Sequence, residues 1–373
     1  MSDEEEIIAS IALTKTPLLG LRTSKKLIDY LGSAKGIFSS LDELKETGLH
    51  INPDLYDSLS SKKPKEEALL EYQFAKKHQI QCIPYSDREY PYRLKECEDA
   101  PLLLYFKGNC NLNMPYVISM VGTRRSTQYG RQLCADFLKG LKEVIPDALI
   151  ISGLAFGIDI TSHQLALELN FPTIGVLAHG LDRIYPSQHK KIAIQMLEQG
   201  GVITEFSSNT SPERYNFVSR NRIIAGMSDA TIVVESASKG GALITADLAN
   251  SYNRDCFTFP GRISDQYSEG CNQLIKQNKA SLITSAEDFI KAMRWDKITM
   301  DKQKGNPIQR DLFPNLNSEE EQIVNLLQQQ GRVQFDNLLE GTHLPIQRLH
   351  TDLFNLEMQG IIRVLAGGQY ELV

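Results

Sequence analysis

One stretch near the middle of the chain combines residue types that suit nucleic-acid binding. It reads Phe217-Val218-Ser219-Arg220-Asn221-Arg222-Ile223-Ile224-Ala225-Gly226 and precedes an apolar run. A guanidinium group is a planar fork that matches phosphate, and an aromatic face can stack on a base. The stretch therefore predicts a site that binds a nucleotide backbone, although its arginines could instead pair with neighbouring carboxylates.

Other loops in the same part of the chain carry groups that suit an anion. They span residues 122–130, 152–163 and 235–245, and a fourth leads from Glu205 into the opening stretch. Each places small residues, hydroxyl groups or bases at the start of a predicted helix, where free backbone amides favour negative charge. One such loop could be a tight turn, but four at one edge of a sheet predict a surface that binds phosphate groups.

An alternation of strands and helices predicts how these loops come together. Apolar runs indicate strands at 117–121, 148–151, 173–178, 202–205, 231–234, 256–259 and 282–284, with helical stretches such as 128–143, 158–169 and 187–199 between them. This alternation is typical of a parallel sheet covered on both faces. We expect an α/β, doubly wound, Rossmann-like domain, whose ligands bind at the carboxyl ends of the strands. Two earlier runs, 80–84 and 102–106, should extend its sheet.

The length of 373 residues allows two or three domains. We expect a helical module at 1–64, an extended Rossmann-like domain at 65–296, a polar linker at 297–316 and a winged-helix domain at 317–373. The module contains a turn, Thr16 to Arg22, that is similar to the hairpin of helix-hairpin-helix modules. The last domain is predicted by a capping box at Ser318 and Glu321, three short helices and two strands joined at Gly367-Gly368.

Charge is spread unevenly along the chain, whose net charge is −6. Residues 115–295 carry 18 bases and 17 acids, whereas residues 317–373 carry 3 bases and 8 acids. A polyanion site is therefore expected in the middle of the chain, and the winged-helix domain is expected to contact protein.

Composition narrows the class of protein. The apolar content of 42% is ordinary for a soluble globular chain, and no apolar run approaches the ~20 residues that span a membrane. The acidic start, Ser2 to Glu6, is unlike a secretory leader. Six cysteines without a CxxC pair predict reduced thiols and no metal site. We expect a cytoplasmic protein without a membrane partner.

Two common nucleotide chemistries are excluded by missing motifs. The chain has no G-x-G-x-x-G after the first parallel strand and no G-x-x-x-x-G-K-[ST] loop, so neither NAD chemistry nor ATP hydrolysis is expected and no cofactor is predicted. His163 follows Asp159 by one helical turn, and we interpret it as a satisfied buried histidine rather than a general base.

Several motifs of the middle domain occur in an order that identifies a family. They are Val121-Gly122-Thr123-Arg124, the run from Ser152 to Asp159, Gly180-Leu181-Asp182 with Tyr185-Pro186, the run from Arg220 to Gly226, and Pro260-Gly261-Arg262. With its flanking modules, the chain resembles the DNA-processing family DprA, also called Smf. It departs from the family at Thr123, which is usually serine, and at Gly240-Gly241-Ala242, where the family has serine-glycine-serine.

The resemblance implies a function. It implies a protein that binds single-stranded DNA without strong sequence preference and hands the strand to the RecA recombinase during natural transformation. It also implies a homodimer formed through the Rossmann-like domain, accessory modules at both ends and no catalytic activity.

The chemistry of the loops fits this function, because a single strand needs a basic groove and a stacking surface. We expect Arg124 and Arg214 to contact phosphates and Phe217 to stack on a base. Neutral hydrogen bonds are expected from Ser152, Gly153 and Asn221. The full set of expected contacts is Gly122, Thr123, Arg124, Ser126, Ser152, Gly153, Ala155, Arg214, Phe217, Arg220, Asn221, Arg222, Gly240, Gly241 and Thr245.

The two arginines of the opening stretch should have different roles. On a helix, residues two apart point about 200° away from each other. One of Arg220 and Arg222 should therefore face the DNA while the other pairs with Glu205 or Glu235. Both could face the DNA if the segment were extended.

An enzymatic alternative is a nucleotide-binding or nucleotide-hydrolysing Rossmann protein, such as the phosphoribohydrolases that activate cytokinins. The domain resembles them distantly, but their P-G-G-x-G-T loop is missing, since Lys239 precedes Gly240-Gly241-Ala242. A third hypothesis is a sensor that binds a free nucleotide and signals through the winged helix.

Overall fold

A computed structural model of the chain describes residues 3–41, 53–296, 316–365 and 368–372. They belong to two compact units, Met1–Thr299 and Met300–Val373. The predicted linker lies outside the described residues except for Leu316.

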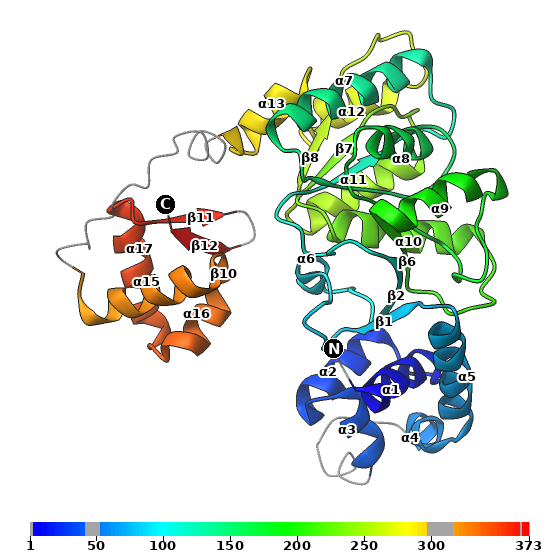
Figure 1. Cartoon of the computed structure of the whole chain (residues 1–373), viewed down its shortest axis with the longest axis vertical. Coiled ribbons are helices and arrows are strands. Elements are labelled where there is room, and N and C mark those ends of the chain that lie inside the picture. The colour runs from blue at the N-terminus through cyan, green and yellow to red at the C-terminus, as the bar shows by residue number, and fades with distance from the viewer. Residues whose placement is uncertain (1–2, 42–52, 297–315, 366–367, 373) are drawn as a thin grey trace. The chain divides into compact units, whose positions relative to one another are not determined.

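The first unit is built around one sheet, to which the described residues contribute nine strands (Figure 1). In chain order they are β1 (Gln81–Pro84), β2 (Leu103–Gly108), β3 (Val117–Val121), β4 (Leu149–Ser152), β5 (Thr173–Val176), β6 (Gly200–Thr204), β7 (Ala230–Val233), β8 (Asp255–Thr258) and β9 (Ser281–Leu282). Their order across the sheet is β1-β2-β6-β5-β4-β3-β7-β8-β9. All pairs from β6 to β9 are parallel, while β1 and β2 add antiparallel strands beside β6. The predicted Rossmann-like core and its two-strand extension are both confirmed.

Helices cover both faces of this sheet (Figure 1). Successive strand residues enter different cores: Val117 and Val121 of β3 pack into one, and Ile118 and Met120 into the other. The first core also holds apolar residues of α10 (Arg214–Gly226), α11 (Gly241–Ser251) and α12 (Glu269–Lys276). The second holds those of α7 (Gln128–Val144), α8 (Ile158–Glu168) and α13 (Ala286–Ala292). Strands buried on both faces explain the continuous apolar runs of the sequence.

The chain reverses its direction across the sheet at β3. From β3 it proceeds through β4 and β5 to β6, and it then returns to the other side of β3 to form β7. The elements between β5 and β7 include η2 (Ser187–His189), α9 (Lys190–Gln199) and α10. In open α/β sheets such a switch point leaves a crevice at the carboxyl ends of the strands.

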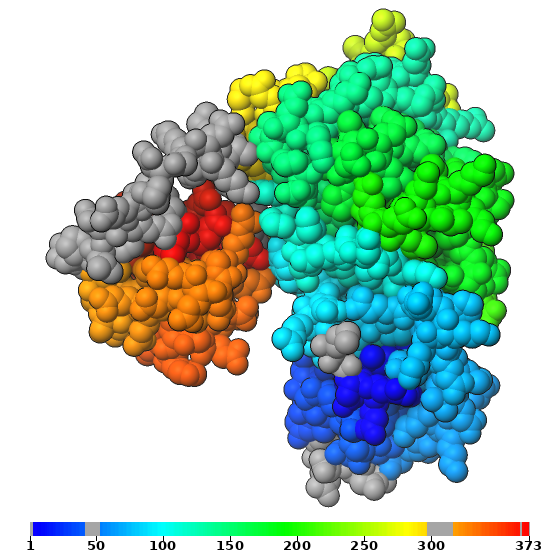
Figure 2. Space-filling view, viewed as in Figure 1, coloured from blue at the N-terminus to red at the C-terminus, as the bar shows by residue number. Residues whose placement is uncertain are grey.

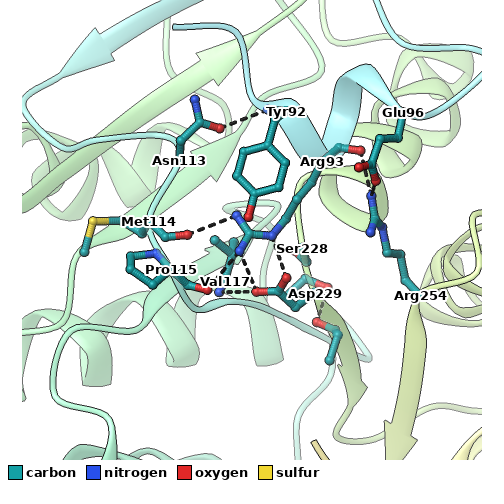
Figure 3. Close-up of polar contacts among 12 residues, drawn as sticks. Tyr92, Arg93, Glu96, Asn113, Met114, Pro115, Val117, Ser228, Asp229 and Arg254 are labelled. Atoms are coloured by element: carbon teal, nitrogen blue, oxygen red, sulfur yellow. Dashed lines mark hydrogen bonds and ion pairs between the residues drawn. The ribbon is translucent and has the colours of Figure 1, made fainter. Parts of the chain in front are cut away.

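A buried ion pair holds the starts of the two strands at this switch point (Figure 3). Arg93 of the short helix α6 (Tyr92–Lys95) donates from Nε and Nη2 to both carboxylate oxygens of Asp229, at 2.6 and 2.9 Å. Its guanidinium also donates to the carbonyls of Met114 and Pro115, each at 3.0 Å. Asp229 in turn accepts from the amide of Val117 at 2.8 Å. One arginine therefore fixes the entry to both β3 and β7.

The N-terminal helices share a core with the edge of the sheet. They are α1 (Glu4–Lys15), α2 (Leu21–Leu31), α3 (Ala34–Ser39), α4 (Pro53–Ser60) and α5 (Lys63–Lys77). Ile11 of α1 and Ala68 of α5 pack in one cluster with Leu103 and Tyr105 of β2. The predicted boundary at residue 64 thus falls inside α5, and Figure 2 shows a continuous surface from these helices to β1 and β2.

The second unit has the predicted winged-helix composition and carries its own core. Its elements are α15 (Ser318–Gln330), β10 (Val333–Gln334), α16 (Phe335–Thr342), α17 (Ile346–Met358), β11 (Ile362–Leu365) and β12 (Gln369–Leu372), with strand order β10-β12-β11. The capping box lies one residue earlier than predicted, because Asn317 rather than Ser318 is the N-cap and pairs reciprocally with Glu320. Gly367 at the predicted hairpin joint lies outside the described residues.

Replacing the buried arginine should destabilise the first unit. We expect Arg93→Met to lower the free energy of unfolding by about 3–5 kcal/mol, because Asp229 would keep a partly buried charge without its partner. Urea unfolding followed by the fluorescence of Trp295, the one tryptophan of the sequence, measures this unit, since Trp295 lies in its core. The exposed Arg88→Met is the control and should change stability by less than about 0.5 kcal/mol. Equal stability of the two variants would contradict the role of the ion pair.

Candidate nucleic-acid interface

A cavity of about 1060 Å³ lies where the switch point predicts a crevice. Its walls are the loops that follow β3, β4 and β7, together with α10 and the start of α11. The predicted contact residues that line it are Gly122, Thr123, Arg124, Ala155, Arg214, Phe217, Arg220, Asn221, Gly240, Gly241 and Thr245. The structure therefore brings the predicted loops to one place.

The rim of the cavity is positively charged. Arg124, Arg125, Arg214 and Lys239 are exposed there, and within the described residues none of them has an ion-pair partner. Of the two acids in the lining, Asp247 pairs with Lys279 at 2.7 Å and Asp159 is buried. Unpaired guanidinium and ammonium groups beside the free amides that begin α11 favour a polyanionic ligand.

Phe217 provides the aromatic surface of the cavity. It lies in the first turns of α10, half-buried, with the Arg124 guanidinium carbon 5.2 Å from its ring centroid. The ring of Tyr185 lies 5.9 Å away, centroid to centroid. A ring flanked by a cation and a second ring suits the stacking of a planar base.

Arg220 forms the floor of the cavity. Only 3% of it is exposed, and its Nη1 donates to the carbonyl of Val176 at 2.9 Å. Burial lowers the pKa of Arg220 to about 10, an effect that the neighbouring charge of Asp159 opposes. Burial raises the pKa of Asp159, and the charge of Arg220 opposes that shift. The Nε of Arg220 has no hydrogen-bond partner among the described residues, so one N–H donor below the cavity is unpaired.

Arg222 takes the scaffold role predicted for one of the two arginines. Its guanidinium pairs with the carboxylate of Glu205, which Ser219 also contacts. Because the segment is helical, Arg220 and Arg222 point in different directions, and Arg220 is the one that reaches the cavity. The expected contact of Arg222 with DNA is therefore not supported by the structure.

Three other predicted contacts lie outside the cavity lining. Ser152 is fully buried and its hydroxyl donates to the Met120 carbonyl at 2.6 Å, so the hydrogen bond expected to reach DNA is made within the protein. Ser126 accepts from the Arg131 guanidinium through both its carbonyl and its hydroxyl oxygen. Gly153 lies behind Arg220, and a Cβ on it would meet Arg220 Nη1 at 1.7 Å. Its role is to make room for the arginine.

Two lining residues use their polar groups within the protein. Thr245 is buried and its hydroxyl donates to the Gly241 carbonyl at 3.1 Å, and the Asn221 amide nitrogen donates to the same carbonyl at 3.3 Å. Asn221 therefore fixes α11 against α10. Its side-chain oxygen can still accept a hydrogen bond from a ligand in the cavity.

Of the two carboxylates expected to pair with an arginine, Glu205 does so and Glu235 does not. The carboxylate of Glu235 accepts from the backbone amide and the hydroxyl of Thr127, the N-cap of α7.

His163 is fully buried as predicted, and its Nδ1 lies 2.7 Å from the Thr173 hydroxyl. Burial lowers its pKa to about 3, so the ring is neutral at pH 7, but its Nε2 lacks a hydrogen-bond partner among the described residues. His163 is therefore a buried histidine in which only one ring nitrogen has a hydrogen-bond partner among the described residues.

Three residues of the lining that carry basic or aromatic side chains are absent from the predicted contacts: Arg125, Lys239 and Tyr267. Arg125 and Lys239 lie in the predicted loops, beside the residues expected to make the contacts. Tyr267 reaches the cavity from the long loop after β8, which also contains Pro260-Gly261-Arg262, but no charged residue or glycine directly adjoins it in the sequence. Among the described residues, no cluster of histidine, cysteine or carboxylate side chains is arranged to hold a metal ion, and no helix is long and apolar enough to cross a membrane.

Comparison with known proteins identifies relatives along most of the chain. The family model described as DNA recombination-mediator protein A matches residues 81–294, and the DprA winged helix domain matches residues 311–368. Protein Smf of Escherichia coli is 34% identical over 298 residues, which cover 78% of this chain and 77% of that protein. DNA processing protein DprA of Bacillus subtilis is 38% identical over 215 residues, covering 57% and 71%.

Two solved structures are similar as well. DNA processing protein A of Streptococcus pneumoniae aligns with a TM-score of 0.61 at 31% identity, over 78% of this chain and 98% of that one. DNA processing protein A of Helicobacter pylori, whose structure concerns its binding of single-stranded DNA, aligns with a TM-score of 0.53 at 29% identity, over 58% and 97%.

The close approach of Gly153 and Arg220 gives a test of the cavity floor. We expect Gly153→Ala to displace the arginine and to lower the free energy of unfolding by more than about 2 kcal/mol, because the new methyl group would overlap a buried guanidinium. Gly20→Ala is the matched control, since a Cβ there meets nothing within 4 Å. Urea unfolding followed by Trp295 fluorescence measures both. Wild-type stability of Gly153→Ala would show that Arg220 does not occupy this position.

Proposed function

Because the chain belongs to the DNA recombination-mediator family that includes DprA and Smf, we propose that its cavity binds single-stranded DNA. The observation that carries the proposal is the combination of unpaired bases and a half-buried phenylalanine in one cavity. The basic side chains suit the phosphates of the strand, and Phe217 suits one of its nucleobases.

The arrangement favours a single strand over a duplex. The aromatic ring lies inside the cavity rather than on a convex surface, and the bases of a duplex are already stacked on each other. A strand with free bases can place one on Phe217 while Arg124, Arg214 and Lys239 contact the flanking phosphates. Stacking accepts any base, so the proposal includes weak sequence preference.

The site does not favour the hydrolytic alternative. A phosphoribohydrolase needs a carboxylate near its glycine loop, but Glu235 is buried and both of its oxygens accept from Thr127. Asp159 is buried beside Arg220. We therefore retain a binding function without catalysis.

The proposed function includes transfer of the strand to RecA in the cytoplasm during natural transformation, by a homodimer formed through the Rossmann-like domain. Family membership supports the proposed transfer to RecA and the proposed homodimer.

We expect the protein to shorten the lag of RecA filament assembly on single strands coated with single-strand-binding protein, measured by RecA-dependent ATP hydrolysis. The variant Arg124→Ala should restore the lag. An unchanged lag with the wild-type protein would contradict the RecA step while leaving DNA binding intact.

Two substitutions in the cavity should separate phosphate contact from stacking. Fluorescence anisotropy with a labelled single strand over a salt series measures both, because log affinity falls with log salt by ~0.7 per phosphate contact. We expect Arg124→Ala to flatten this slope. We expect Phe217→Ala to weaken binding by about 1–3 kcal/mol with little change of slope.

Matched controls come from exposed residues outside the cavity. Arg88→Ala removes a distant exposed arginine, and Tyr215→Ala removes an aromatic ring from the same first turn of α10 that is 79% exposed and not in the lining. Both should bind like the wild type. If Arg124→Ala and Phe217→Ala also bind like the wild type, the cavity is not the DNA site.

A further inference from the structure

A second cavity, of about 880 Å³, adjoins the first. Tyr267 lines both, so the two cavities meet at this residue. The second is formed by the start of α7 and by the loop that follows β8, which contains the Pro260-Gly261-Arg262 motif. DNA binding in the first cavity leaves this motif unexplained.

The loop after β8 is held in one shape by its own contacts. A Cβ on Gly261 would meet the Ser268 hydroxyl at 2.0 Å, so only glycine permits the two ends of the loop to approach. The side chain of Asn272 bridges Gly261, accepting from its amide at 3.1 Å and donating to its carbonyl at 2.9 Å. The amide of Ser236, just after β7, donates to the Tyr267 carbonyl at 2.7 Å. The cavity wall is therefore fixed to the edge of the first cavity.

The aromatic groups of the second cavity are also positioned. The Tyr129 hydroxyl donates to the carbonyl of Pro260 at 3.0 Å, which anchors the far end of its ring, while 48% of the residue remains exposed. Tyr267 lies half-buried at the junction. Two tyrosines with anchored or half-buried rings offer planar surfaces at low entropic cost to a ligand that stacks.

The charges of this lining differ from those of the first cavity. Arg262 and Asp265 both lie on its wall, so their charges offset each other. The other acid, Glu235, already accepts from Thr127 with both oxygens. The amide side chains of Gln128 and Gln266 add neutral donors and acceptors. A balanced, amide-rich and aromatic lining suits a nucleobase better than it suits a phosphate.

We propose that the second cavity holds an unstacked base of the same single strand, beyond the base that stacks on Phe217. Tyr129 supplies the stacking surface, Arg262 contacts the base or the backbone beside it, and Tyr267 lies between the two subsites. The strand then runs from the α10 side of the switch point across the end of β7 to the loop after β8. This inference rests on the proposed function, because it extends the same DNA site.

A length series tests the second subsite by itself. We expect Tyr129→Leu and Arg262→Ala each to weaken binding of an oligothymidine of about 12 nucleotides by about tenfold, and to leave one of about 4 nucleotides unaffected, since the short strand fills only the first cavity. Tyr129→Phe keeps the ring but loses its anchor to Pro260, and it should bind the longer strand more tightly than Tyr129→Leu does. Tyr30→Ala, which removes a 59% exposed ring from α2, and Arg88→Ala are the controls. Thermal unfolding of each variant checks that the fold is retained.

A crosslinking measurement identifies the contact directly and does not depend on substitutions. Single strands that carry one 5-iodouracil at successive positions are irradiated with the full chain, and crosslinked peptides are identified by mass spectrometry. We expect crosslinks at Tyr129 or Tyr267 from a position different from the one that crosslinks to Phe217.

The outcomes separate this inference from the proposed function. If Phe217→Ala loses affinity while Tyr129→Leu and Arg262→Ala bind both lengths like the wild type, and no crosslink forms at Tyr129 or Tyr267, the second subsite is overturned and the first stands. If the wild-type chain binds neither length, both proposals fall.

Discussion

The site depends on a charged group placed where the sheet changes direction. Arg220 lies almost fully buried under the cavity, with its guanidinium against the Val176 carbonyl of β5 and beside Asp159 of α8. Gly153 after β4 leaves the space that it fills. A buried arginine without these partners would be costly, so its presence couples β4, β5 and α8 to one position of α10. Phe217 and Asn221, which line the cavity, are carried on that same helix.

The charge distribution of the chain follows from this local design. The protein as a whole is acidic, with a net charge of −6, yet the basic side chains around the cavity lack acidic partners among the described residues. The winged-helix unit is the opposite case, because each arginine among its described residues pairs with a glutamate: Arg332 and Arg363 with Glu371, and Arg348 with Glu319. Paired arginines offer little to a phosphate backbone, which agrees with the expectation that this unit contacts protein.

Most of the fold and part of the site can be predicted from the sequence, because both follow from local periodicity. Buried strands give apolar runs, and the carboxyl ends of parallel strands must meet, so the loops around Gly122 and Gly240 are expected at one edge. The 3.6-residue period of a helix also predicts that Arg220 and Arg222 point in different directions. Side-chain choices that depend on distant partners leave no such local pattern. Ser152 hydrogen-bonds to Met120, Glu235 hydrogen-bonds to Thr127, and Tyr267 reaches the cavity from a position in the loop after β8 that no motif marks.

Hydrogen–deuterium exchange with and without a single-stranded oligonucleotide can establish whether the cavity binds DNA, because it reports the contact on the unmodified chain. If the strand binds in the cavity, we expect slower exchange in the loop after β3, at the start of α10 and at residues 239–245, with no change in α2 or in the winged-helix unit. Protection confined to α2 or to the winged-helix unit, with the loops around the cavity unchanged, would contradict binding in the cavity.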